Sequence, residues 1–130
     1  MMYVMDASAL MALVKNEKGG DVVDALIDQQ ECVASSVNIA EVCSKLLEAG
    51  VASADLKRII RNMNVDVIDF NQDQALASAE LRPLTKSAGL SLGDRACLGL
   101  AKLMSGTAVT SDRPWLDVAE AVGVTVLMIR

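Results

Sequence analysis

The chain has 130 residues, of which 52% are hydrophobic, and it carries a formal net charge of −5. This length fits one domain with a single core, and the high hydrophobic content excludes a disordered chain. The acidic balance argues against a broad basic surface for nucleic acid, and three aromatic residues are too few for a site that stacks bases on aromatic rings.

Short apolar runs alternate with helical segments along the whole chain. Residues 2–5 are an apolar run typical of a buried strand, and the apolar spacing within residues 21–30 is that of a helix. In chain order we expect a strand at 2–5, helices at 7–14 and 21–30, a strand at 31–34, helices at 37–50 and 53–63, a strand at 65–70, a helix at 71–89 that bends near Pro83, a helix at 92–106, a strand at 107–112, a helix at 113–123 and a strand at 124–129.

This alternation predicts the fold class. Strands that alternate with helices, with no internal repeat and no linker, indicate an α/β domain with a mostly parallel sheet of about five strands. Nothing suggests a second domain, so we expect one domain over residues 1–130.

The cysteines and the N-terminal segment indicate where the protein works. Cys32, Cys43 and Cys97 form no CxxC pair and lie among apolar residues, so we interpret them as core residues in a reducing compartment. No basic segment precedes the first apolar run, and no apolar stretch reaches the roughly 18 residues that a membrane span needs. We therefore expect a cytoplasmic protein. The chain has no histidine, which argues against a zinc site and excludes every mechanism that needs an imidazole.

Two carboxylates follow directly on predicted strands. Asp6 ends the first apolar run and Asp112 ends the fourth strand. In open α/β sheets, ligands bind just beyond the carboxyl ends of the strands, and two carboxylates that converge there repel each other unless a cation or a proton intervenes. This placement favours a divalent metal. Taken singly, Asp6 also fits a helix N-cap, and Asp112 also fits a turn before Pro114.

Two further acids have weaker local patterns. Asp94 follows Ser91 at the spacing of a capping box, so capping alone would account for it. Glu41 lies opposite the apolar stripe of its helix, which favours a solvated side chain. Asn38, three residues earlier, could hydrogen-bond Glu41 and orient it.

Taken together, these segments resemble the PIN-domain ribonuclease family, in particular the VapC toxins of prokaryotic toxin–antitoxin pairs. The resemblance covers the whole chain. It rests on four motifs in order: D-x-S at residues 6–8, N-x-x-E at 38–41, L-S-L-G-D-R at 90–95 and T-x-D-R-x-W at 110–115.

The resemblance implies a three-layer α/β/α fold and a metal-dependent nuclease site. The four metal-binding and catalytic acids it implies are Asp6, Glu41, Asp94 and Asp112, and the polar groups that support them are Ser8, Asn38 and Thr110. Carboxylate oxygens suit Mg²⁺ or Mn²⁺, which would activate water for hydrolysis of RNA phosphodiester bonds without an imidazole. The bound metal would also neutralise part of the negative charge of the acids. An acidic chain could then bind RNA, which is a polyanion. Arg95 and Arg113, each next to one of these acids, fit either a substrate contact or an exposed surface.

The same resemblance implies partners. We expect an RNA substrate, with tRNA or rRNA as the target, and a small VapB-like antitoxin that blocks the acidic site. We also expect a homodimer, no membrane, and contact with DNA only through the antitoxin. A PIN-domain nuclease of RNA processing, without a toxin role, is the alternative within the family.

Three other classes of protein fit less well. A receiver domain of a response regulator needs a pair of acids after the first strand and a lysine after the fifth, whereas this chain has one Asp and then Ala7-Ser8 after its first strand and only Arg130 after its last. A metal-dependent adhesion module needs D-x-S-x-S, and Leu10 replaces the second serine. A pure RNA-binding module would need aromatic residues or a basic excess.

Overall fold

Five parallel strands form the centre of the structure, a computed structural model that describes residues 1–130. The strands are β1 (Met2–Met5), β2 (Glu31–Ser35), β3 (Asp66–Ile68), β4 (Thr107–Thr110) and β5 (Thr125–Met128). Their order in the sheet is β3-β2-β1-β4-β5, and every neighbouring pair is parallel. The predicted α/β class and strand number are therefore confirmed, and the sheet is fully parallel.

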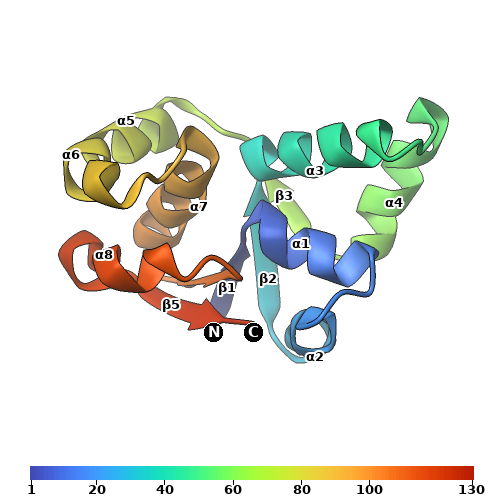
Figure 1. Cartoon of the computed structure of the whole chain (residues 1–130), viewed down its shortest axis with the longest axis horizontal. Helices are drawn as coiled ribbons and strands as arrows, with labels where there is room; N and C mark the ends of the chain where they lie inside the picture. Colours follow the sequence, from blue (N-terminus) through green and yellow to red (C-terminus); the bar gives the residue numbers. More distant parts are fainter.

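Helices connect the strands and cover both faces of the sheet (Figure 1). The helices are α1 (Ala7–Val14), α2 (Gly20–Gln29), α3 (Ser36–Glu48), α4 (Leu56–Met63), α5 (Gln72–Glu80), α6 (Arg82–Thr85), α7 (Leu92–Leu103) and α8 (Pro114–Val122), with short 3₁₀ helices η1 (Ser53–Asp55) and η2 (Lys86–Ala88). Helices α1–α4 lie on one side and α5–α8 on the other (Figure 1). This is the three-layer arrangement that the resemblance implied.

The side chains of successive strand residues pack alternately into two separate hydrophobic cores, one on each side of the sheet. Met5 and Val109 belong to the core under α1–α4, whereas their neighbours Val4 and Ala108 belong to the core under α5–α8. A parallel sheet is stable only when both faces are covered, which explains why its strands are apolar on both sides.

The largest difference from the prediction lies in residues 71–89. The single bent helix expected there is divided into α5, α6 and η2. Pro83 stands in the first turn of α6, where the missing N–H costs nothing, so the chain restarts a helix at Arg82 instead of bending one. The helix expected at 53–63 is likewise divided into η1 and α4.

Three strands are shorter than expected, and the fifth covers Thr125–Met128 instead of 124–129. The third covers Asp66–Ile68 instead of 65–70, and the fourth ends at Thr110 instead of Asp112. Because β4 stops early, Ser111 and Asp112 leave the sheet and form a loop at its carboxyl edge.

No helix combines the length and apolarity needed to cross a membrane. Cys32 and Cys97 are buried and Cys43 is half-buried, and all three are free thiols, as expected for packed core residues.

Candidate metal centre

Asp6 is the buried centre of the site. It follows β1 directly and is 2% exposed. Its Oδ1 accepts a hydrogen bond of 2.8 Å from the Ala9 amide, so the residue is also the N-cap of α1. Asp6 can therefore serve both as a helix N-cap and as a metal ligand, because the hydrogen bond of the cap occupies only part of the carboxylate.

Two hydroxyl groups complete the surroundings of the Asp6 carboxylate. The Thr110 hydroxyl donates to Oδ2 at 2.6 Å, and the Ser8 hydroxyl lies 2.7 Å from Oδ1 and 2.9 Å from Oδ2. The sheet register causes this meeting, since β1 and β4 pair Met5 with Val109 and so bring the following residues, Asp6 and Thr110, side by side. Three donors on one carboxylate favour its ionised form.

The same hydroxyls hold the loop that carries Asp112. The Ser8 hydroxyl accepts from the Ser111 amide at 2.9 Å, and the Thr110 hydroxyl accepts from the Asp112 amide at 3.0 Å. Each hydroxyl therefore donates to Asp6 and accepts from the loop. The role of the Ser111 backbone could not be predicted from the sequence, because it depends on contact between residues about a hundred positions apart.

Three of the four predicted acids converge. Asp6, Asp94 and Asp112 each offer a carboxylate oxygen, and these oxygens all lie within 4.8 Å of one another. Asp94 reaches the cluster from the first turn of α7, where it also forms the predicted capping box: the Ser91 amide donates to Asp94 Oδ2 at 2.9 Å, and the Asp94 amide donates to Ser91 Oγ at 3.2 Å.

Glu41 lies beside this group but outside it. The Asn38 Nδ2 group donates to Glu41 Oε1 at 2.9 Å and to the Gly93 carbonyl at 3.0 Å, which ties α3 to the first turn of α7. The Glu41 carboxylate packs against the Cα atom of Gly93, so closely that a Cβ there would overlap it. Glu41 is half-buried, and the interpretation as a fully solvated side chain is wrong. Asn38 orients Glu41 as expected.

The pKa values of the site show that its negative charge is only partly compensated. Burial raises the pKa of Asp6 from 3.8 to about 6, against the lowering effect of its hydrogen bonds with Thr110, Ala9 and Ser8. Burial also raises the pKa of Asp112, and the neighbouring Asp94 adds to this. Cys97, buried behind the acids, has its thiol pKa raised by burial and then by the charges of Asp6, Asp94 and Glu41.

The donor set fits a small divalent cation. Opposite oxygens in an octahedral Mg²⁺ site lie about 4.2 Å apart, twice the roughly 2.1 Å bond length. The observed limit of 4.8 Å is therefore within reach of small side-chain adjustments. All ligands are hard oxygens, as Mg²⁺ and Mn²⁺ prefer, and a cation would relieve the repulsion that raises the carboxyl pKa values.

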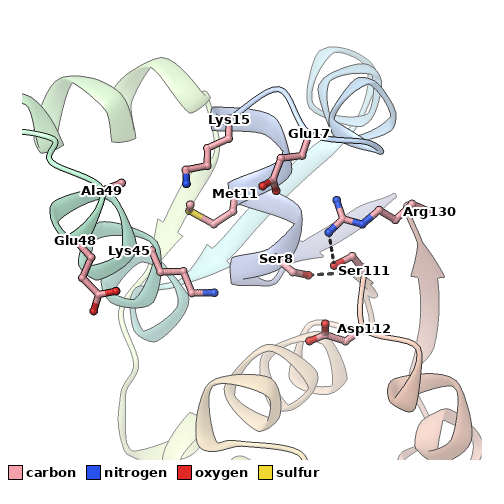
Figure 2. Close-up of a pocket in the computed structure, with 10 residues that line it drawn as sticks. All are labelled: Ser8, Met11, Lys15, Glu17, Lys45, Glu48, Ala49, Ser111, Asp112 and Arg130. Atoms are coloured by element: carbon pink, nitrogen blue, oxygen red, sulfur yellow. Dashed lines mark hydrogen bonds between the residues drawn. The ribbon is translucent and has the colours of Figure 1, made fainter.

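An open pocket of about 520 Å³ adjoins the acidic cluster and shares Ser8 and Asp112 with it (Figure 2). Its wall also carries the cations Lys15, Lys45 and Arg130, none of which the sequence singled out. Arg95, by contrast, turns toward α5 and donates from Nη1 to the Ser78 carbonyl at 3.2 Å.

The fold and site together define an α/β domain that gathers carboxylates at the carboxyl edge of a parallel sheet. The family model described as PIN domain matches residues 3–121. The chain belongs to the PIN-domain family, as its motifs indicated.

Solved structures share this fold at low sequence identity. The VapBC2 complex of Rickettsia felis, bound to a DNA fragment from its promoter, has a chain with a TM-score of 0.76 at 15% identity, with 98% of each chain covered. DNA-bound VapBC of Salmonella typhimurium gives a TM-score of 0.76 at 15% identity, with 100% of this chain and 99% of the other covered. FitAcB of Neisseria gonorrhoeae gives 0.69 at 19% identity, with 98% of each chain covered. Comparison with curated proteins finds no significant match.

Proposed function

We propose that the protein is a metal-dependent endoribonuclease that cleaves RNA phosphodiester bonds with water. The observation that carries this proposal is the convergence of Asp6, Asp94 and Asp112 within 4.8 Å, one of them buried, in a PIN domain. Burying a carboxylate beside two others without a cation is costly, so the arrangement makes physical sense as a cation-binding site.

Each residue has a defined task in this proposal. Asp6, Asp94 and Asp112 hold Mg²⁺ or Mn²⁺, which supplies Lewis-acid activation of water and neutralises phosphate charge. Ser8 and Thr110 keep Asp6 ionised and fix its orientation through their short hydrogen bonds. Asn38 holds Glu41 at the edge of the site, where Glu41 acts as the fourth acid toward a second cation or its water shell.

We further propose that this nuclease is the VapC-type toxin of a type II toxin–antitoxin pair, with tRNA or rRNA as its target. The likeness of the fold to chains of VapBC complexes supports this role. The partner would then be a small VapB-like antitoxin that blocks the acidic site and makes the only contact with DNA, and the toxin itself would form a homodimer in the cytoplasm.

The chemistry is tested with Asp6→Asn and Asp94→Asn. Asparagine is a good N-cap, so Asp6→Asn keeps the start of α1, and Asp94→Asn leaves Ser91, the N-cap of α7, in place. Each variant therefore loses only a charged ligand. We expect the purified wild-type protein to cleave RNA with Mn²⁺ or Mg²⁺ and both variants to be inactive, with unchanged circular dichroism. Asp73→Asn, an exposed acid in the first turn of α5, is the matched control. Full activity in either site variant would refute the proposal.

The biological role is tested by expression. A toxin should arrest growth when it is produced alone, and co-expression of a neighbouring small reading frame should restore growth. If expression of the active nuclease were harmless, a role in RNA processing would replace the toxin role, and the proposed chemistry would stand.

A further inference from the structure

The pocket beside the acidic cluster holds unpaired cations in an acidic protein. Lys15, Lys45 and Arg130 come from three separate parts of the chain: the end of α1, the helix α3 and the segment after β5. The only ion pair closer than 4.0 Å is Arg58–Asp55, on the exposed surface of α4 and η1. None of the three pocket cations therefore has a protein carboxylate within 4.0 Å.

The cations differ in how they are placed. Lys45 extends from α3 toward Ser8, and Arg130 reaches toward Ser111 from the opposite side, with Asp112 below (Figure 2). Arg130 is held in place, because its Nη1 donates to the Lys18 carbonyl at 2.7 Å and its Nη2 lies 3.5 Å from Ser111 Oγ. Both cations act on Asp112, where their charges oppose the rise in its pKa.

The carboxylates on the pocket wall narrow the choice of ligand position. Glu17 lies on the same part of the pocket wall as Lys15, whereas Glu48 points away from the centre of the pocket (Figure 2). Lys45 and Arg130 thus place positive charge on either side of Ser111 (Figure 2). Two cations that face each other across an open polar pocket favour a phosphate group, which accepts from an ammonium and a guanidinium together.

We propose that Lys45 and Arg130 form a subsite for a backbone phosphate of single-stranded RNA, one that neighbours the phosphate cleaved at Asp6, Asp94 and Asp112. This inference rests on the proposed function and deepens it. The subsite positions the substrate and does not take part in bond breaking, so its loss weakens binding more than it slows the chemical step. It also explains how a chain with net charge −5 can approach a polyanion, since positive charge is placed where the substrate enters.

Lys45→Met tests the subsite, because methionine keeps the length of the side chain and removes only its charge. Lys86→Met, an exposed lysine on η2 that does not line the pocket, is the matched control. With a short single-stranded RNA and Mn²⁺, we expect Lys45→Met to raise KM roughly fivefold, which is the effect of losing one exposed ion pair. The kcat should change less than about twofold. Arg130→Met should act in the same direction.

A binding measurement separates this inference from the proposed function. In the Asp94→Asn background, fluorescence anisotropy should show that Lys45→Met lowers the slope of log affinity against log salt by about 0.7 for single-stranded RNA, and that Lys86→Met leaves it unchanged. Equal KM and equal salt slope for the Lys45 and Lys86 variants would overturn the subsite while cleavage by the wild type upholds the nuclease. Absence of cleavage in the wild type would overturn the nuclease, and the anisotropy slopes would still decide whether Lys45 binds phosphate.

Discussion

Replacing Thr110 by valine removes one hydroxyl group and keeps the shape of a fully buried side chain. In the wild type this hydroxyl donates to Asp6 Oδ2 at 2.6 Å and accepts from the Asp112 amide at 3.0 Å. Hydrogen bonds to charged groups contribute about 1.5–3 kcal/mol, against roughly 1 kcal/mol for a neutral pair. We therefore expect Thr110→Val to lower the unfolding free energy of the metal-free protein by about 2–3 kcal/mol near pH 7.5.

The size of this effect depends on pH in a defined direction. Burial raises the pKa of Asp6 from 3.8 to about 6, so the folded chain binds this proton more tightly than the unfolded chain does. Its contribution to stability is complete below about pH 4 and is lost as the pH rises through about 6, a loss of about 3 kcal/mol in the wild type. Thr110 is the first of the groups that lower this pKa, so valine raises the pKa further and enlarges the loss.

The difference between variant and wild type should consequently be about 1 kcal/mol near pH 4.5 and about 2–3 kcal/mol near pH 7.5. For 130 residues, the latter corresponds to a fall in Tm of about 7–11 °C. Urea unfolding in the presence of a chelator measures it, with fluorescence of the buried Trp115, the only tryptophan, as the probe.

Thr107→Val is the control for this experiment. Thr107 is buried at the other end of β4 and takes no part in the hydrogen bonds of Asp6. It should show a smaller change that does not vary with pH. Equal destabilisation by Thr110→Val at both pH values would refute the idea that the hydroxyl acts through the ionised carboxylate.

Two further predictions concern Glu41 and the cation. Alanine is a better helix former than glycine, but Gly93→Ala places a methyl group where the Glu41 carboxylate lies. RNA cleavage should therefore fall at least about tenfold, while the unfolding free energy changes by less than about 1 kcal/mol. Full activity of this variant would show that the position of Glu41 is unimportant. Because Asp6 must lose its proton to bind a metal, Mn²⁺ affinity measured by calorimetry should fall as the pH decreases below about 6; an affinity that does not change with pH would exclude Asp6 as a ligand.

The sequence predicted the strands and their terminal acids because both depend on local patterns. An apolar run that ends in Asp6 or near Asp112 indicates a strand that reaches the carboxyl edge of a sheet. The adjacency of β1 and β4 could not be predicted in the same way, since about a hundred residues separate them. It is this adjacency that brings Thr110 onto Asp6 and the Asp112 loop onto Ser8.

Glu41 and Lys45 show why helical periodicity misled or gave no signal. Periodicity assigns a side chain to the apolar or the polar face of its own helix, and both residues lie outside the apolar stripe of α3. Their roles depend on what lies beside the polar face of α3. The first turn of α7 lies beside Glu41, where Asn38 donates to the Gly93 carbonyl. Lys45 lines the pocket beside Asp112. Only tertiary packing determines these neighbours.

Asp6 lowers the stability of the metal-free fold but favours the proposed metal binding. An ionised carboxylate that is 2% exposed weakens the metal-free fold, and its hydrogen bonds recover only part of the loss, since the pKa stays raised at about 6. Asp94 and Asp112 add repulsion, and neither Lys nor Arg lies within 4.0 Å of any of the three carboxylates. A neutral residue at this position would end the strand and cap the helix equally well. A divalent cation would attract each of the three carboxylates and so outweigh the repulsion between them. The feature that weakens the metal-free fold thus provides the affinity for metal that the proposed nuclease requires.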